Sequence, residues 1–325
     1  MATPESDHAR ILASGDGIAT VRAALGLNEL SALMTRGVKA LLGMLLPEAY
    51  ADRLADAVRL DWLAHSIVTT ATLVGGLLVV FLVLERLSVA RPTAFRSRVF
   101  LQDALYAFFY QGGFYVILIW SAFANAFDTH LAFLKIEILA GLPGPVHWVL
   151  YVLMVDFSTY WWHRMLHTWT PLWAFHSVHH SQEEMSFITS YRAHPFEQLA
   201  QSLFMVVPLL LIGTPTWRWL PLFLVMSMLE AAQHSALDWT YGPAYTVVVS
   251  PRFHALHHSR DSRFHHGNYA KVLSLWDFLF GTAIRAERPG RFGVEGIPPP
   301  QTLWDQLMSP FRLLREWDRA RIERL

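Results

Sequence analysis

Residues 141–180 read GLPGPVHWVLYVLMVDFSTYWWHRMLHTWTPLWAFHSVHH, an apolar segment that runs directly into a group of histidines. Residues 141–155 contain no Asp, Glu, Lys or Arg, and Asp156 ends this uncharged part. His163 follows about two helical turns later. Because uncharged segments of this kind are typical of helices that enter a bilayer, we expect this helix to present its histidines where it leaves the membrane.

Other uncharged segments indicate further membrane helices. They are Ile67–Leu84, Ala104–Phe127, Gln198–Trp217 and Trp219–Leu229. Gly213-Thr214-Pro215 interrupts the last two, so these could form a re-entrant hairpin instead of two full spans. The composition agrees, since 53% of the chain is hydrophobic and only 16% is charged, against about 25% in soluble domains. We predict an all-α integral membrane protein with four to five membrane helices.

Charge distribution predicts three regions and an orientation. Residues 1–64 are mixed in charge and predict a helical soluble or interfacial segment without a signal peptide. Residues 65–285 hold the membrane helices, and residues 286–325 form a polar tail with an amphipathic helix from about Thr302. Basic loops lie mostly on the cytoplasmic side, so we expect residues 86–98 and the region after Trp239 to face the cytoplasm. The side on which residues 1–64 lie is left open.

Net charge and cysteine content exclude several functions. The formal net charge is zero, which gives no indication of nucleic-acid binding. The chain has no cysteine, which excludes disulfides, zinc–thiolate sites and cysteine-bound iron–sulfur clusters.

Three histidine groups occupy about one third of the chain. Twelve of the sixteen histidines lie between residues 163 and 266, where even scatter would place about five. The groups are one H-x3-H pair, His163 and His167, and two H-x2-H-H motifs, His176, His179, His180 and His254, His257, His258. Residues three or four apart share a helix face, so each group can aim at least two imidazoles at one point. Imidazole suits zinc, copper, iron and nickel, and this many ligands would suit two adjacent ions.

Other residues are less specific candidates. His234 is expected to be a further ligand, with Glu230 and Asp238 one turn to either side. His194 and Asp238 are each expected to bind metal or to support a ligand. Candidate hydrogen-bond partners for the ligand imidazoles are the carboxylates Asp156, Glu197, Glu230 and Asp277. Structural roles are expected for the remaining histidines, His8, His65, His130, His147, His265 and His266.

The order of these motifs resembles the fatty acid hydroxylase superfamily, which includes sterol desaturases, sterol methyl oxidases and sphingolipid hydroxylases. The resemblance covers residues 156–282, from the H-x3-H pair through Arg192-Ala-His194-Pro to Asn268-Tyr269 and Trp276-Asp277-x2-Phe280-Gly281-Thr282. It implies a helical anchor carrying a cytosol-facing dimetal site with iron as the working metal and O2 as co-substrate. The implied ligands are the eight clustered histidines and His234. Some relatives have a further histidine where this chain has Asp238.

The expected activity is hydroxylation of a lipid C–H bond. Iron is also favoured by chemistry because zinc has no redox function, although zinc can replace iron in preparations. The lipid's class stays open. Electrons must come from a separate ferredoxin, cytochrome or reductase, because the chain has no cysteine, Gly-x-Gly-x-x-Gly motif or recognisable haem domain.

Three alternatives to a hydroxylase remain. A desaturase could use the same site. A non-catalytic metal-binding or transport protein would place its ligands near the bilayer midplane on broken helices. A bis-histidine haem carrier needs single histidines on facing helices, which the H-x2-H-H motifs do not resemble.

Overall fold

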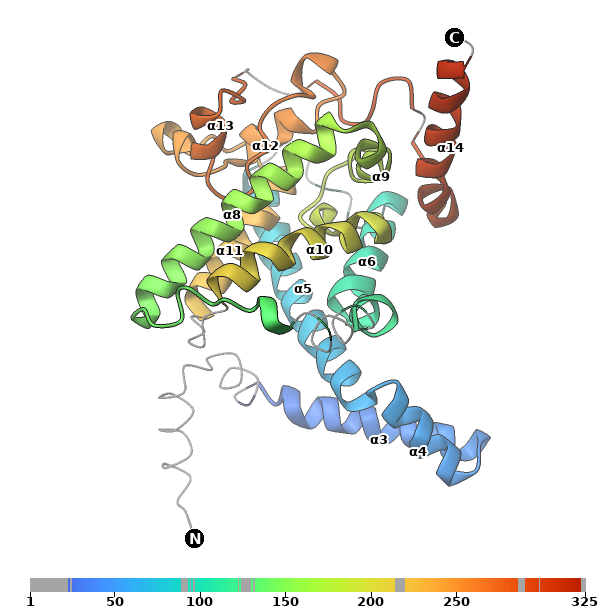
Figure 1. The fold of residues 1–325 in the computed structure, drawn as a ribbon. Coiled ribbons are helices and arrows are strands. Elements are labelled where there is room, and N and C mark those ends of the chain that lie inside the picture. Colours follow the sequence, from blue (N-terminus) through green and yellow to red (C-terminus); the bar gives the residue numbers. More distant parts are fainter. Residues whose placement is uncertain are drawn as a thin grey trace.

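In the residues that it describes, the computed structural model consists of helices joined by loops and turns. The described residues are 23, 25–88, 93, 95, 97–121, 123, 130, 132–213, 220–285, 290–297 and 299–322. Within them the only β pairing is an isolated bridge between Ser259 and Phe292. The α-helices are α3 Leu27–Leu45, α4 Glu48–Ala57, α5 Leu60–Ser88, α6 Arg98–Gln111, α8 Gly144–Thr168, α9 Thr170–His180, α10 Pro195–Ile212, α11 Leu220–His234, α12 Pro251–His257, α13 Leu275–Leu279 and α14 Leu303–Ile322 (Figure 1). Short helical turns lie at Val116–Trp120, Ala132–Leu134, Thr189–Tyr191, Gly242–Thr246 and Ser262–Phe264. The all-α prediction is confirmed for this part of the chain.

Helix α8 carries the apolar segment without interruption to the first histidine pair. It starts with Pro145 in its first turn and continues past Asp156 to Thr168. Trp169 then has an extended backbone, and α9 starts at once with Pro171 in its first turn. Proline suits the first turn because its missing N–H is not needed there. The sharp bend folds α9 back against α8, so the first two histidine groups face each other.

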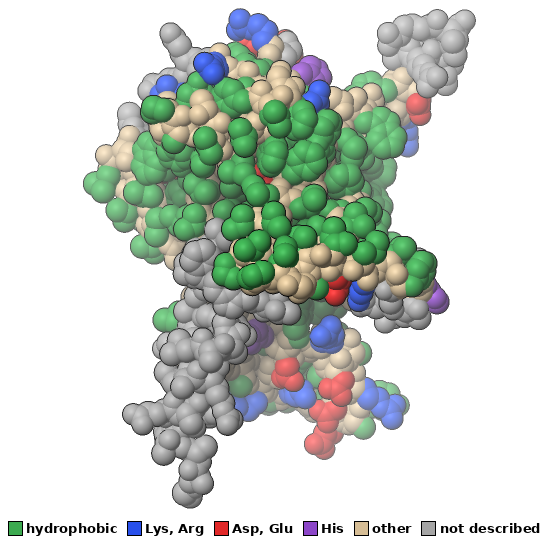
Figure 2. Space-filling view, turned by 60° about the vertical axis from the view of Figure 1, so that its left-hand side comes forward, with side chains coloured by type: hydrophobic (Ala, Val, Ile, Leu, Met, Phe, Trp, Pro, Cys, Tyr) green, Lys and Arg blue, Asp and Glu red, His purple; other side chains and the backbone are tan. Residues whose placement is uncertain are grey.

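Two described helices are long and apolar enough to cross a bilayer, namely α5 and α10. Much of their surface is apolar and exposed, for example Val79 and Val83 on α5 and Leu203 and Val207 on α10. Figure 2 shows hydrophobic side chains over most of one face of the helical body, with charged side chains gathered toward its ends. Broad exposed apolar surfaces of this kind mark membrane or protein contacts. The total of four to five spans stays a prediction.

The segment Ala104–Phe127 does not form the single uninterrupted helix that its composition predicts. Helix α6 ends at Gln111, a turn follows at Gly112 and Gly113, and a π-helical turn occupies Val116–Trp120. Gly113 has φ of +92°, and a Cβ atom there would lie 2.6 Å from the Trp62 ring of α5. Only glycine fits such a contact and such a dihedral without strain. This explains the break in the helix, which the absence of charged residues did not indicate.

The chain ends on either side of this body extend the helical architecture. Helices α3 and α4 pack against α5, and α5 begins at Leu60, so the predicted boundary between residues 64 and 65 lies inside a helix.

Helix α14 confirms the amphipathic helix expected from about Thr302, whose hydroxyl caps it by accepting from the Asp305 N–H at 3.0 Å. It packs against α9 (Figure 1). Gly213 follows the last residue of α10 with φ of +75°, while the predicted hairpin at residues 214–219 lies outside the described residues.

Candidate metal centre

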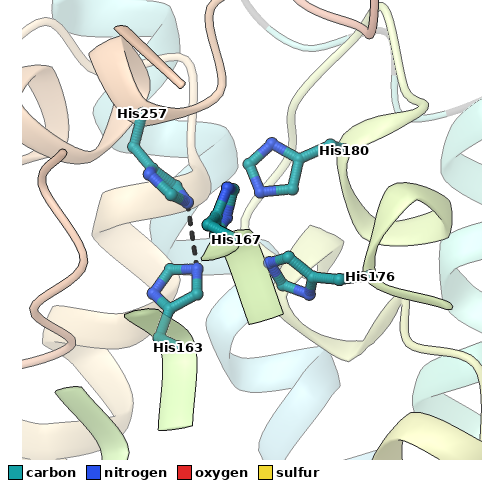
Figure 3. A group of neighbouring side chains, drawn as sticks. All are labelled: His163, His167, His176, His180 and His257. Atoms are coloured by element: carbon teal, nitrogen blue, oxygen red, sulfur yellow. Dashed lines mark hydrogen bonds between the residues drawn. The ribbon is translucent and has the colours of Figure 1, made fainter. Parts of the chain in front are cut away.

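Five histidines from three helices converge on one point. His163 and His167 come from α8, His176 and His180 from α9, and His257 from α12, and one ring nitrogen from each lies within 4.8 Å of all the others. Figure 3 shows the five rings turned toward a common centre. All except His163 are buried, and His163 is partly buried.

Four more histidines form a second group beside the first. These are His179 of α9, His234 of α11, His254 of α12 and His258 directly after α12, all buried and again within 4.8 Å at their ring nitrogens. The two groups touch, since the rings of His180 and His258 stack with centroids 4.4 Å apart. Every histidine that the sequence predicts as a ligand therefore lies in one of two adjoining groups.

Helix periodicity explains how each H-x2-H-H motif serves both groups. In each motif the first and last histidines, four residues apart, join one group, and the middle one joins the other. His176 and His180 belong to the first group and His179 to the second, while His254 and His258 belong to the second and His257 to the first. Positions i and i+4 lie nearly one above the other, whereas i+3 is rotated to the side. One motif can thus bridge two neighbouring ions.

Hydrogen bonds to backbone carbonyls fix the ring tautomers. The Nδ1–H groups of His163, His179 and His257 donate to the carbonyls of Tyr269, Arg192 and Gly267, at 2.7, 3.0 and 2.8 Å respectively. His234 Nδ1 donates to the Glu230 carbonyl at 3.2 Å, and His176 Nδ1 donates to Glu197 Oε1 at 2.8 Å. A neutral imidazole has a single N–H. In these five rings Nε2 is therefore left with its lone pair, the form that binds metal.

The closest approach in the first group is unfavourable without a cation. Nε2 of His163 and Nε2 of His257 lie 2.9 Å apart (Figure 3), although both rings have already used their N–H on carbonyls. Two lone pairs facing each other at this distance repel. Two nitrogens bound side by side to one ion, each at about 2.1 Å, would be about 3.0 Å apart. The separation fits ligation of a shared ion.

Further ring nitrogens have no protein partner. Among the described residues, buried Nε2 atoms without a hydrogen-bond partner occur in His167, His176 and His180, and such Nδ1 atoms occur in His254 and His258. Buried polar atoms are otherwise almost always satisfied. The donor set and its unsatisfied atoms therefore fit two bound transition-metal ions.

Burial also keeps the imidazoles neutral. The pKa values of His179, His180, His257 and His258 are held well below the ordinary histidine value, first by loss of hydration and then by neighbouring histidines. At neutral pH these rings are therefore unprotonated. Metal binding would not have to displace protons from them.

Comparison with known proteins agrees with this geometry. Residues 148–282 match the family model described as fatty acid hydroxylase. This part of the chain is similar to the fatty acid hydroxylase superfamily. No solved structure gives a significant match.

Three relatives show where the similarity lies. An ornithine lipid hydroxylase of Rhizobium tropici is 33% identical over 169 residues, 50% of each chain. An alkylglycerol monooxygenase of Danio rerio is 34% identical over 177 residues, which cover 53% of this chain and 38% of the relative. A very-long-chain aldehyde decarbonylase of Oryza sativa subsp. indica is 34% identical over 164 residues, covering 47% of this chain and 60% of the relative. The chain thus spans about half the length of the curated relatives it matches, or less for some.

The C-terminal part of the matched region positions carbonyl acceptors, which the sequence alone does not reveal. Asp277 accepts from the backbone N–H groups of Tyr269 and Ala270 at 2.9 and 2.8 Å. Asn268, with φ of +57°, donates from Nδ2 to the carbonyls of Phe253 and Ile284. These contacts hold the segment that carries the Gly267 and Tyr269 carbonyls against His257 and His163. The expectation that Asp277 contacts an imidazole is not met in this structure, because its oxygens bind backbone.

Asp156 has the same kind of role. It accepts from the N–H groups of Val272 and Leu273, both at 3.0 Å, and from Trp276 Nε1 at 2.8 Å. It contacts no histidine through these bonds and instead ties residues 272–276 to α8. Of the carboxylates expected to hold an imidazole, Glu197 does so, through His176.

The remaining candidates lie outside both groups. Glu230 contributes its backbone carbonyl to His234, while its carboxylate pairs with Lys271 at 2.9 Å. The carboxylate of Asp238 receives two bonds from Arg252, at 2.7 and 2.8 Å.

Three of the other histidines have structural partners. His194 caps α10 by accepting from the Phe196 N–H and donates from Nε2 to the Leu307 carbonyl, so both ring nitrogens are used. His147 bonds the Gly213 carbonyl at 3.2 Å, and His265 bonds the Ser259 carbonyl at 3.1 Å.

We expect Asp156→Leu to weaken the site without removing a ligand. It would leave the Val272 and Leu273 N–H groups and the Trp276 indole without their acceptor, at about 1–3 kcal/mol for each orphaned buried group. The variant should melt at a lower temperature and retain less metal than the wild type. Asp318→Leu, on the exposed face of α14, is the matched control. Unchanged melting and metal content in Asp156→Leu would contradict this role.

Proposed function

We propose that this chain is a membrane-bound, dimetal, O2-dependent oxygenase that hydroxylates a C–H bond of a lipid. The observation that carries the proposal is the convergence of nine histidines into two adjoining groups whose facing nitrogens lack partners or repel. Single ligand pairs occur in many proteins. Two buried all-histidine groups in contact, with ring nitrogens that lack other partners, support the binding of two cations.

The nine histidines would hold two iron ions, five around one and four around the other. Iron bound there would supply the O2 activation that C–H oxidation needs, which zinc cannot provide. In the overall reaction one oxygen atom enters the C–H bond and the other leaves as water, with two electrons and two protons taken up. A separate ferredoxin, cytochrome or reductase would supply the electrons, since the chain has no cysteine.

The residues around the histidines would orient and protect the site. The carbonyls of Gly267, Tyr269 and Arg192 keep each Nε2 lone pair directed inward. Glu197 holds His176 and places its second oxygen, which has no partner among the described residues, in the same buried space. Such outer partners raise ligand basicity and fix ring orientation.

We propose that the anchor lies in the membrane with the metal centre at its cytoplasmic face. The apolar helices α5 and α10 and the exposed leucines and valines on them support a bilayer setting. The four arginines among residues 86–98 support the orientation. The relatives named as ornithine lipid hydroxylase and alkylglycerol monooxygenase support a lipid substrate.

The proposal predicts a metal content and a requirement for an electron donor. Protein purified in detergent after growth with iron should contain about two metal ions per chain, counted by mass spectrometry. With lipid and O2 it should turn over repeatedly only when a reductase system is added. A metal content near zero, or sustained turnover with NAD(P)H alone, would contradict the corresponding part of the proposal.

A further inference from the structure

Two cavities reach the histidine groups through different parts of the fold. The first, of about 400 Å³, has five of the nine histidines in its wall, and other wall residues come from α5, α6, α10 and α11. The second, of about 520 Å³, is bounded by the end of α8, by α9, by residues 265–266 and 294–297, and by α14. Of the nine histidines only His167 lines it. The group of five can therefore be approached through two separate spaces.

The second cavity ends at a ligand nitrogen without a partner. Nε2 of His167 has no hydrogen-bond partner among the described residues, and the residue is only 7% exposed. Trp173 lines the same cavity, and its ring centre lies 5.0 Å from that of His167 and 5.5 Å from that of His180. An ion that arrives through this cavity would meet His167 before any other member of the group.

The outer wall of the second cavity carries groups that attract and bind divalent metals. Glu295 and Glu316 are its two charged side chains, both are exposed, and neither pairs with a base in the part of the chain that the structure describes. His265 and His266 line it as well. His265 donates from Nε2 to the Ser259 carbonyl, so its neutral ring keeps a lone pair on Nδ1. Carboxylate and imidazole both bind first-row divalent ions.

These four side chains do not form a closed metal site of their own. Within the described residues, the groups of three or more potential ligands whose atoms lie within 4.8 Å of one another are the two histidine groups. A passage for ions must bind them well enough to admit them and weakly enough to release them. Widely spaced ligands meet that requirement, and a complete set of ligands would trap the ion on its way.

A hydrated cation fits the second cavity better than the first. With about six waters it needs roughly 200 Å³, since a water occupies about 30 Å³ in the liquid, and the second cavity is larger than this. The wall of the first cavity includes Leu73 of α5 and Gln201 of α10, the two described helices suited to a bilayer. Its Lys271–Glu230 pair sums to zero charge. An approach through lipid would also cost the ion its hydration, about 20 kcal/mol in the idealised limit.

We propose that the second cavity is the route by which metal ions reach the histidine centre of the folded protein. Glu295 and Glu316 draw the hydrated cation to the cavity, and His265, His266 and then His167 pass it inward. Helix α14, which lies against α9 (Figure 1), thereby takes part in metal acquisition through Glu316. This inference rests on the dimetal centre of the proposed function.

The first test measures metal uptake and needs no turnover. Metal-free full-length protein in nanodiscs would be mixed with Co2+, and binding would be followed by the visible absorption of cobalt. Clefts lined by one sign of charge raise on-rates by about 10–1,000-fold. Glu295→Gln/Glu316→Gln should therefore load about tenfold more slowly than the wild type at low ionic strength, and reach the same final content. Added salt should slow the wild type toward the variant.

The matched control removes two negative charges elsewhere. Glu29 and Glu48 are exposed on α3 and α4 and line neither cavity, so Glu29→Gln/Glu48→Gln should load at the wild-type rate. Equal loading rates in wild type and Glu295→Gln/Glu316→Gln at low salt would overturn the route.

A second pair of variants compares the two cavities directly. Leu313 of α14 lines the second cavity and Leu73 of α5 lines the first. Leu313→Trp should slow both cobalt uptake and its removal by a water-soluble chelator, because an obstructed passage is obstructed in both directions. Leu73→Trp makes the same change in the first cavity and should alter neither rate. The opposite result would make the first cavity the entrance.

The final cobalt content separates this inference from the proposed function. We expect about two ions per chain in every variant, with circular dichroism showing that each metal-free protein is folded. No uptake by any folded variant would count against the dimetal centre itself and would remove the basis of the route. Full uptake at rates that the second cavity does not influence would overturn the route alone. The carboxylate variants change side-chain size very little, so they test the route even if Leu313→Trp lowers the yield.

Discussion

Replacing His179 or His257 by alanine should abolish product formation and reduce the metal content from about two ions per chain to about one or fewer. His179 belongs to the group of four and His257 to the group of five. The Nδ1–H of each ring donates to a backbone carbonyl, and this bond directs the Nε2 atom toward its histidine group. No neighbouring side chain could supply an equivalent nitrogen without disturbing this arrangement. The apolar helices are untouched, so membrane insertion should be normal.

The control for these variants is His130→Ala. His130 is exposed and lies outside both groups, so its variant should match the wild type in membrane yield, metal content and product. Yield separates loss of function from loss of folding. If His179→Ala and His257→Ala kept both ions and product while His130→Ala lost them, the metal centre would be misplaced.

The convergence of the candidate ligands was predictable because helix geometry is local. The spacings of His163/His167 and of the two H-x2-H-H motifs fix which imidazoles share a face, and the structure places all of them and His234 in two groups. The division of each motif between the groups was not predicted. It depends on how α9 and α12 face each other, and that information is not local.

The roles of the carboxylates were harder to predict for a related reason. Asp156 and Asp277 were expected to contact imidazoles, but they bind backbone N–H groups of residues 269–273 and the Trp276 indole. The atoms that accept from His163 and His257 are carbonyls, and every residue has a carbonyl, so no residue type marks them. The aspartates are recognisable from the sequence, but the backbone carbonyls that they help to position are not.

The break in residues 104–127 shows a limit of composition. Lack of charge predicted one long helix, yet Gly112 and Gly113 end α6 because Gly113 packs against Trp62 with a positive φ. Paired glycines inside an apolar segment were the available signal. The partner that makes them necessary lies on α5 and cannot be identified from the local sequence.

A buried ion pair behind the second histidine group was also missed. Arg192 Nε donates to Asp103 Oδ1 at 2.5 Å, and both side chains are almost fully buried. The carbonyl of Arg192 accepts from His179, so the pair anchors α6 to the segment that positions a candidate ligand. Arg192 belongs to the Arg-x-His-Pro motif, in which a functional role was predicted for the histidine but not for the arginine.

We expect Arg192→Met to be among the most destabilising substitutions outside the histidines. It leaves Asp103 buried without its cation, which costs about 3–5 kcal/mol. The double variant Asp103→Leu/Arg192→Met removes both charges and should recover part of that loss. Thermal unfolding in one detergent, followed by circular dichroism, measures the order wild type, double variant, single variant. Arg263→Ala breaks an exposed pair with Asp261 and should leave the melting temperature unchanged. A single variant as stable as the wild type would show that Asp103 is adequately solvated without Arg192, and that the pair does not hold the His179 anchor.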